Sequence, residues 1–248
     1  MSSRHARQPP PVLRRVRGAA AALVASVVVA LLAPAPGAGA PPPRRIVYAG
    51  DRDFPPYEFL DSAGRPSGLN VELIRAVAKA QGLEVEILLE PWVQVRKDLA
   101  SGAADVAAMY RTEHRVREVD FAIPHEVVYH EMFVRAGAAP LTGVGDLTGK
   151  KVLYQGGSYP EDALAALSCR CTPIPAATER GALEALARGE GDVAVVSQAM
   201  RRPFVDRKEL GRAVVQTGPP ILVAEYAFVT AKGREPLVET LNLGLAAV

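Results

Sequence analysis

Strand-like and helix-like segments alternate along residues 45–197, and this alternation limits the possible folds more than any other feature of the sequence. Apolar runs rich in branched and aromatic residues predict strands over 45–49, 85–88, 106–109, 127–134, 151–154 and 192–196. Helical spacing predicts helices that begin at Asn70, as a cap, and that span 93–100, 161–167 and 179–188. Apolar strands that alternate with helices are typical of parallel sheets covered on both faces, so we expect an α/β protein.

A nine-residue pattern occurs twice, as LASGAADVA over 99–107 and as LARGEGDVA over 186–194, with six identical positions. Each copy reads as a helix end, a glycine C-cap, an Asp-led turn and a buried strand. Two explanations fit the repeated pattern equally well. One is that ordinary helix–Gly–strand junctions converge on similar residues, and the other is that the chain forms two lobes of similar structure. In the second case we expect a ligand cleft between the lobes, near the carboxyl ends of the strands.

The N-terminal segment has the features of an export signal. Arg14, Arg15 and Arg17 precede an uncharged run over 18–33, and small residues and prolines follow. This order is typical of a secretory signal peptide, which we assign to residues 1–40. The alternative is an uncleaved anchor helix, although the run is short for a membrane span of about 20 residues. We therefore expect a periplasmic or other extracytoplasmic location.

Composition excludes several classes of function. Outside residues 1–40 the chain has 24 basic and 27 acidic residues and no basic cluster, which argues against nucleic-acid binding. Cys169 and Cys171 are too close for an unstrained disulfide, so free or intermolecularly paired thiols stay open alternatives. Three histidines lack partners at metal-binding spacing and are expected on the surface: His114, His125 and His130. We expect no metal and no organic cofactor.

Six segments occur in an order that resembles a known family. They are DRDFPPYEF over 51–59, GLNVEL over 68–73, GAADVAAM over 102–109, TEHR over 112–115 with DFAIP behind it, LTGKKV over 147–152 and QGGS over 155–158. Together they resemble the family 3 solute-binding proteins, the polar amino-acid type of periplasmic receptor. No single motif is specific, but six in the right order are a strong signal.

The resemblance implies a two-lobed periplasmic-binding-protein-like fold of type II, with two hinge crossings. Lobe 1 would comprise residues 44–135 plus 222–248, and lobe 2 residues 136–221. The crossings would fall near 134–136 and 222–225, which allows the lobes to close around a small-molecule solute. The implied partner is a membrane permease or a fused or associated signalling domain.

The resemblance also implies a ligand site. Its main anchor would be Arg115, whose guanidinium can hold a carboxylate through two parallel hydrogen bonds. Thr112 is expected to accept a hydrogen bond from the backbone N–H near Arg115. The other residues implied to contact the ligand are Asp51, Phe54, Trp92, Ala108, Tyr110, Ser158, Tyr159 and Ser197.

Two departures from the family concern this site. Amino-acid binders hold the ammonium of the ligand with an Asp that lies five residues after the Asp of G-x-x-D-A; counted from Asp192, that position is Ser197. Tyr110 also stands in a region where the family has a small hydroxyl residue. We therefore expect a carboxylate-bearing solute other than a standard α-amino acid, unless an acid such as Asp53 or Glu225 takes the missing role.

The sequence favours a binding protein over an enzyme, because it shows a cleft and anchors. A dehydratase-type enzyme on the same fold is the weakest alternative, with Glu58, Glu126 or Glu225 as its acid or base. Two roles for a binding protein remain, and the sequence favours them almost equally. One is uptake through an ABC transporter, and the other is ligand sensing by a membrane signalling protein, such as a sensor kinase. Asn70 and the missing ammonium contact favour the sensor.

Overall fold

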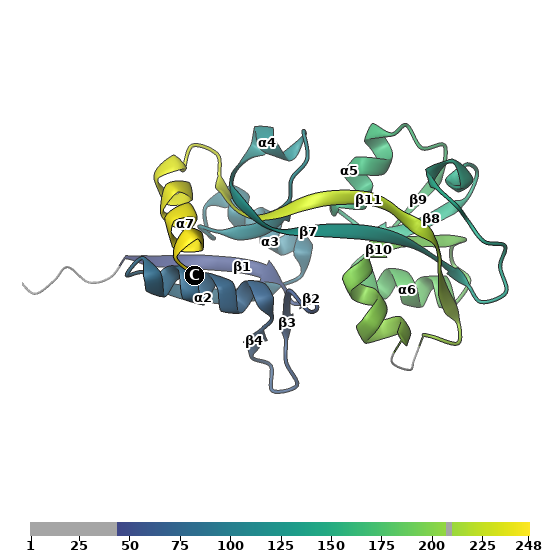
Figure 1. Cartoon of the computed structure of the whole chain (residues 1–248), viewed down its shortest axis with the longest axis horizontal. Helices are drawn as coiled ribbons and strands as arrows, with labels where there is room; N and C mark the ends of the chain where they lie inside the picture. The colour runs from purple at the N-terminus through teal and green to yellow at the C-terminus, as the bar shows by residue number, and fades with distance from the viewer. Residues whose placement is uncertain (1–43, 207–209) are drawn as a thin grey trace, which may run out of the picture. The chain divides into compact units, whose positions relative to one another are not determined.

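The computed structural model describes residues 44–206 and 210–248, so the predicted signal peptide lies outside the described residues. Figure 1 shows two groups of elements joined by two long strands. Lobe 1 holds β1 (Arg45–Asp51), β2 (Asp53–Phe54), β3 (Glu58–Leu60), β4 (Pro66–Ser67), α2 (Leu69–Ala80), β5 (Glu84–Glu90), α3 (Trp92–Ser101), β6 (Ala107–Tyr110), α4 (Arg115–Glu118) and α7 (Glu235–Ala247). Lobe 2 holds η1 (Val144–Leu147), β8 (Lys151–Gln155), α5 (Tyr159–Ala166), β9 (Thr172–Ala176), α6 (Glu179–Ala187), β10 (Val193–Ser197), η2 (Gln198–Met200) and η3 (Arg201–Asp206). Strands β7 (Val119–Arg135) and β11 (Val214–Ala231) run through both lobes.

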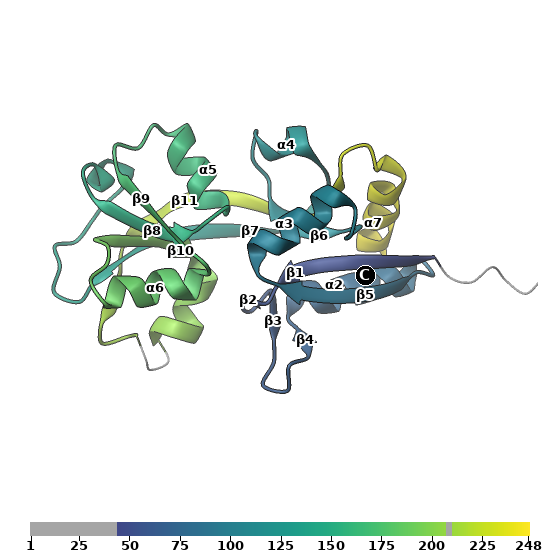
Figure 2. The same ribbon diagram turned by 180° about the vertical axis from the view of Figure 1, so that it is seen from behind.

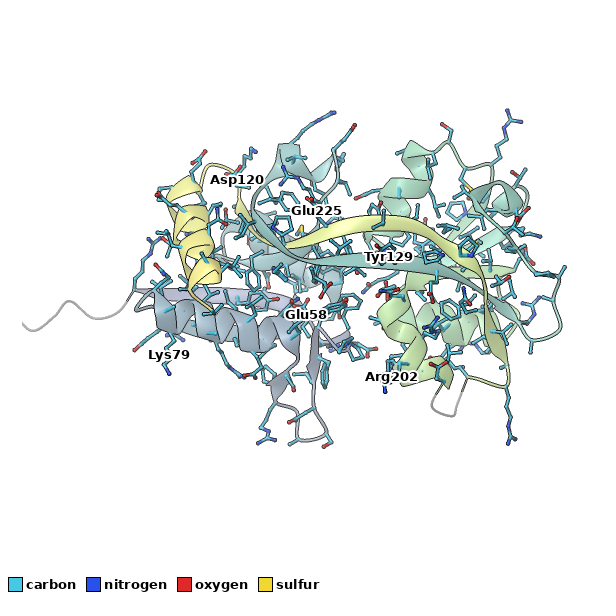
Figure 3. The ribbon with its side chains drawn as sticks, in the orientation of Figure 1. Glu58, Lys79, Asp120, Tyr129, Arg202 and Glu225 are labelled. Atoms are coloured by element: carbon cyan, nitrogen blue, oxygen red, sulfur yellow. A yellow bond between two sulfur atoms is a disulfide. The ribbon has the colours of Figure 1, made fainter. Side chains whose placement is uncertain are left out.

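Strands β7 and β11 pair in antiparallel fashion over nearly their whole length. At one end β6 adds to β11, and at the other β10 adds to β7, followed by β8 and β9. Between these ends Leu222–Glu225 lies opposite His130–Val127, and Figure 3 labels Tyr129 and Glu225 on this two-stranded section. The predicted crossing at 134–136 is not opposite 222–225, because Val134 pairs with Val215. The exact lobe boundaries stay a prediction.

The six-stranded sheet is mixed rather than purely parallel, and the small β2–β3–β4 sheet is antiparallel, which corrects the sequence-based expectation. The pairs β1–β5, β8–β9 and β8–β10 are parallel, as expected for strands connected through helices. The resemblance implied a crossing strand near 222–225, but the full length of β11 was not predicted, because Gly-Pro-Pro at 218–220 reads as a turn. In the structure these residues fall within a register shift between Thr217 and Leu222, and the strand continues beyond it.

The duplicated nine-residue pattern has the same structure in both lobes. Each copy ends a helix, α3 or α6, at a glycine with a left-handed φ, 79° in the first copy and 83° in the second. Asp105 Oδ2 accepts a hydrogen bond from the backbone N–H of Val47 at 3.0 Å, and Asp192 Oδ2 accepts one from Lys151 at 2.8 Å. In both lobes, therefore, the Asp fastens the incoming strand to the start of the lobe's first strand.

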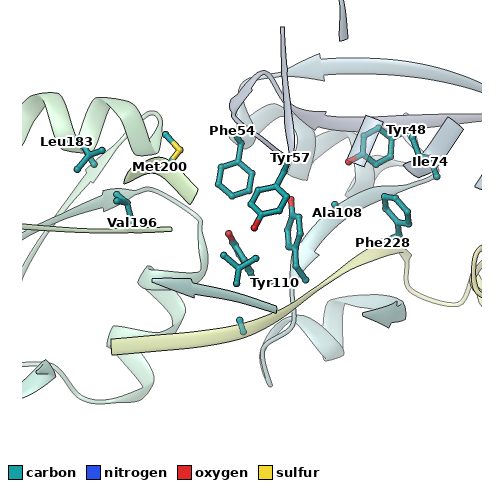
Figure 4. Close-up of a cluster of buried hydrophobic side chains, with 14 of the residues drawn as sticks. Tyr48, Phe54, Tyr57, Ile74, Ala108, Tyr110, Leu183, Val196, Met200 and Phe228 are labelled. Carbon is teal, nitrogen blue, oxygen red and sulfur yellow. The ribbon is translucent and has the colours of Figure 1, made fainter. Parts of the chain in front are cut away.

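Helices cover both faces of the lobe 2 sheet, as Figure 2 shows for α5 and α6. Alternate strand residues face each helix, with Val152 and Val195 in the cluster beneath α5 and Leu153 and Val196 in the cluster beneath α6. The second cluster continues into lobe 1, and Figure 4 shows its span from Leu183 to Tyr48 and Phe228. Each such buried side chain contributes about 1.5–3 kcal/mol, so apolar packing also holds the lobes against each other.

Two further observations bear on the sequence-based expectations. Cys169 and Cys171 form a disulfide with each other, so neither is a free thiol. No helix in the described part of the chain combines the length and the apolar character needed to cross a membrane.

Asn70 lies within α2 and does not cap it. The residue before the helix is Gly68, with φ 118° and ψ 170°, a conformation that is essentially restricted to glycine. A Cβ at Gly68 would lie 2.4 Å from the carbonyl oxygen of Tyr57. This close approach lets Asn70 point its amide towards Glu58, at 3.2 Å from Oε2.

We expect Gly68→Ala to cost about 3 kcal/mol or more in the free energy of unfolding, because it adds a clash to an unfavourable backbone conformation. Gly64→Ala is the matched control, since Gly64 also has a positive φ, 73°, but a Cβ at this position would have no atom within 4 Å. The control should cost only about 1–2 kcal/mol. Urea denaturation measures both values, and equal losses would contradict the close approach.

Candidate functional site

A cavity of about 20 Å³ lies between the lobes. Six of the predicted contact residues line it, namely Asp51, Phe54, Trp92, Ala108, Tyr110 and Ser158. It is also lined by residues that the sequence did not single out as ligand contacts: Glu58, Met109, Gln155, Glu179 and Tyr226. Three predicted contacts, Arg115, Tyr159 and Ser197, lie outside this lining. The cavity has room for about one water-sized group.

The fold places this cavity at the carboxyl ends of strands from both lobes. Asp51 is the last residue of β1 and Tyr110 the last of β6 in lobe 1. Gln155 is the last residue of β8 and Ser197 the last of β10 in lobe 2. Strand ends of this kind carry ligand sites in α/β folds, because the chain leaves the sheet there and exposes side chains.

Aromatic side chains form one wall of the cavity. The Tyr110 ring lies 4.7 Å from the Tyr226 ring and 6.4 Å from the Phe54 ring, centroid to centroid. Figure 4 shows Phe54 and Tyr110 together between the two lobes. Tyr159, outside the cavity lining, packs against Tyr110 at 5.6 Å. The Tyr110 hydroxyl is buried and has no hydrogen-bond partner among the described residues.

The acid beside Ser197 is Glu179. Ser197 stands at the position where the family's amino-acid binders have an Asp. Both carboxyl oxygens of Glu179 lie 3.2 Å from the backbone nitrogen of Ser197, which donates to them. Glu179 is the first residue of α6, which Thr178 caps by accepting a hydrogen bond from Gly181 N–H at 2.9 Å. In the sequence, Thr178 followed by Glu179 indicates the start of a helix with an acid in its first turn. The sequence does not reveal that this helix start contacts the end of β10.

The two acids named as substitutes do not occupy this place. Asp53 accepts a hydrogen bond from Arg180 at 2.6 Å, and Glu225 is exposed on the two-stranded section. His130, which was expected on the surface, is instead fully buried, 4.0 Å from Glu179. Neither of its ring nitrogens has a hydrogen-bond partner among the described residues.

Burial controls the charges around the cavity. It raises the pKa of Glu179 to about 8 and the pKa of Glu58 to about 7, and it also raises the pKa of Asp51. Burial lowers the pKa of His130 to about 3, and nearby Arg115 adds to the effect. His130 is therefore neutral at physiological pH, and Glu179 is mostly protonated.

Arg115 is buried and already has partners. Its backbone N–H donates to Thr112 Oγ1 at 3.1 Å, which confirms the predicted hydrogen bond, although the N-cap residue of α4 is His114. Its Nε donates to Asp162 Oδ2 at 2.8 Å and its Nη2 to the carbonyl oxygen of Gly157 at 3.0 Å, so both bonds cross to lobe 2. Trp92 Nε1 donates to the same carbonyl at 2.9 Å. Only Nη1 of Arg115 lacks a partner among the described residues.

Glu58 lines the cavity and is held in place by hydrogen bonds within lobe 1. It accepts hydrogen bonds from the Tyr48 hydroxyl, from Asp51 N–H at 2.9 Å and from Asn70 at 3.2 Å. Asp51 in turn accepts a hydrogen bond from Gln155 Nε2 of lobe 2 at 2.6 Å. Within residues 44–206 and 210–248 no group of three or more His, Cys, Asp or Glu side chains is placed to hold a metal ion.

We expect Glu179→Gln to stabilise the fold increasingly as the pH rises from 4.5 towards 8. Below pH 4.5 the carboxyl is protonated in both the folded and the unfolded chain, so it makes no pH-dependent contribution. Above that pH the unfolded chain releases the proton while burial retains it in the folded chain, so the wild type loses stability that the variant keeps. Urea denaturation at about pH 5 and about pH 8 measures the change. A difference that does not vary with pH would contradict the raised pKa.

The sequence is similar to those of proteins that are already known. It matches the bacterial extracellular solute-binding proteins, family 3, over residues 46–248. A probable histidine-binding protein of Neisseria gonorrhoeae is 27% identical over 204 residues, 81% of this chain and 76% of the relative. A histidine kinase sensor domain with similarity to periplasmic binding proteins has a TM-score of 0.76 and 35% identity, over 83% of this chain and 90% of that one. An ancestral arginine-binding protein bound to arginine has a TM-score of 0.75 and 27% identity, over 84% and 93%.

These likenesses agree with the architecture described above. The expected two-lobed α/β fold is confirmed, and the relatives are named as binding proteins or as a sensor domain rather than as enzymes. With a match that runs from residue 46 to residue 248, the chain belongs to the bacterial extracellular solute-binding proteins, family 3.

Proposed function

We propose that this protein captures a small, carboxylate-bearing, amino-acid-like solute between its two lobes, outside the cytoplasm. The observation that carries the proposal is the cavity at the strand ends, where both lobes contribute buried polar side chains. The histidine-binding relative and the arginine-bound structure support this class of solute. A cleft with aromatic walls and a few polar groups is typical of a small-molecule site.

Binding requires the lobes to part and close again, because the cavity of about 20 Å³ is far smaller than an amino acid. Contacts that join the lobes without a ligand include the bonds from Gln155 to Asp51 and from Arg180 to Asp53. The hinge would be the section of β7 and β11 where Val127–His130 faces Leu222–Glu225. Among the described strands these residues pair only with each other, except that His130, at the edge of the section, also pairs with Ser197 of β10.

The solute's carboxylate would lie near the start of α5, where Ser158 lines the cavity. Free N–H groups at a helix start favour a negative charge. The unpartnered Nη1 of Arg115 is a further donor in the same region, because Arg115 already contacts Gly157 in the preceding turn. Ser197 would contribute through Glu179, which it holds by its backbone N–H.

We expect amino-acid binding to change the fluorescence of Trp92, because this residue lines the cavity and is the single tryptophan of the chain. The measurement is a fluorescence titration with each standard amino acid and with non-amino organic acids, alongside calorimetry. Free tryptophan titrated with the same compounds is the control, since it reveals any change in emission that the compounds cause by themselves. Saturable binding with unchanged Trp92 emission would place the ligand elsewhere.

A sensory role is the second candidate. The observation that favours it is the 35% identity to a histidine kinase sensor domain, above the 27% identity to the histidine-binding protein. Under this alternative, closure of the lobes is the signal that a membrane kinase reads, and under the first it presents the solute to an ABC-type permease.

The genetic context separates the two roles. We expect genes for a permease and an ATPase beside a transport receptor, and a membrane helix with a kinase domain on the same or a neighbouring reading frame for a sensor. Uptake of the labelled solute in a deletion strain provides the functional readout. Unchanged uptake would exclude the transport role, and loss of uptake would exclude a purely sensory one.

A further inference from the structure

Within the described residues, two ion pairs between arginine and carboxylate side chains join the lobes. One is Arg115 with Asp162, at 2.8 Å, and the other is Arg180 of lobe 2 with Asp53 of lobe 1, at 2.6 Å. Arg115 belongs to the proposed solute site, whereas neither Arg180 nor Asp53 lines the cavity between the lobes. The Arg180–Asp53 pair can therefore form whether or not a solute is bound.

The guanidinium of Arg180 is oriented by its own lobe. Its central carbon Cζ lies 4.5 Å from the centre of the Phe204 ring, which belongs to η3 of lobe 2. A guanidinium over an aromatic ring is attracted by the negative face of the ring and loses part of its rotational freedom. Because this contact does not involve lobe 1, opening of the lobes would leave it intact. Arg180 would then stay directed towards the position that Asp53 occupies in the closed form.

Asp53 is likewise held by its own lobe. It is the first residue of β2, where it pairs with Phe59 of β3, and its backbone N–H donates to Asp51 Oδ1 at 2.9 Å. The side chain of Asp53 is 23% exposed and that of Arg180 is 43% exposed. The ion pair is thus only partly removed from water, so it can break and form again at a small cost in desolvation.

The contact is strong enough to favour closure but too weak to lock the lobes. One charge-assisted hydrogen bond joins the side chains, from Arg180 Nη2 to Asp53 Oδ1. Nε of Arg180 is buried without a partner among the described residues, and a buried donor of this kind opposes closure. Partly exposed ion pairs change an equilibrium constant by about tenfold or less. The lobes can therefore still open to admit a solute.

We infer that Arg180 and Asp53, with the Phe204 ring that orients Arg180, form a latch that favours the closed arrangement of the lobes before any solute is bound. The inference goes beyond the proposed function, because the latch sets the fraction of closed molecules without touching the solute. When a ligand binds one of two conformations, its apparent affinity scales with the fraction of molecules in that conformation. The latch therefore raises the affinity for every solute that binds the closed form by the same factor.

Small-angle X-ray scattering of the ligand-free protein tests the latch without any solute. We expect Asp53→Asn and Arg180→Gln each to increase the radius of gyration, because the ratio of open to closed molecules rises by up to about tenfold. The two changes combined should increase it no further than either change alone. Arg188→Gln is the matched control, since Arg188 lies at the end of the same helix and pairs with Glu190 of its own lobe. An unchanged radius in both single variants, or an additive effect in the combined variant, would overturn the inference.

Calorimetry with the standard amino acids separates a latch from a solute contact. For every amino acid that the wild type binds, Arg180→Gln should lower the affinity by one common factor, of about tenfold or less. A factor that differs strongly between amino acids would indicate contact with the solute and overturn the inference. Absence of binding by the wild type would reject the proposed function, whereas the scattering of the ligand-free protein would still decide on the latch.

Phe204→Leu tests the orienting contact, because it keeps the ion pair and removes the aromatic face. We expect it to increase the radius of gyration by less than Arg180→Gln does. Urea denaturation shows whether each variant is as stable as the wild type. A loss of stability with an unchanged radius in all three single variants would indicate a purely structural role and overturn the inference.

Discussion

The antiparallel pairing of β7 with β11 is the interaction on which the rest of the structure depends. Each strand carries a partner strand at one end, β6 on β11 and β10 on β7, so the same ladder organises both lobes. The ends of β6 and β10 then meet at the site, with Tyr110 paired to Tyr226 and Ser197 paired to His130. Backbone hydrogen bonds thus fix each half of the candidate site within its own lobe, and the short two-stranded section of β7 and β11 joins the two halves.

The site itself is a compromise between burial and charge. Asp51, Glu58 and Glu179 are buried, and burial of carboxylates without cations is unfavourable. The chain meets this cost with hydrogen bonds from backbone N–H groups and from Gln155, and by holding protons on the acids.

Local patterns in the sequence predicted much of the fold and part of the candidate site. Three features depend on neighbours along the chain, and the structure confirms them: the alternation of strands and helices, the repeated turn with Asp105 and Asp192, and the hydrogen bond from Arg115 N–H to Thr112. The residues that were missed depend on contacts between distant segments. Glu179 and Asp162 read as ordinary acids at helix starts, and only the tertiary fold brings them to Ser197 and Arg115.

The hydrogen bonds accepted by the carbonyl oxygen of Gly157 bear on the rate at which the lobes separate. It accepts hydrogen bonds from Trp92 and from Arg115, two donors on different helices of the opposite lobe. Separation of the lobes must break both bonds in the same movement, together with the Arg115–Asp162 pair. A solute enclosed behind this junction leaves only when the whole junction opens, so its residence time is governed by the frequency of that opening, and two solutes of different affinity can share one rate of escape.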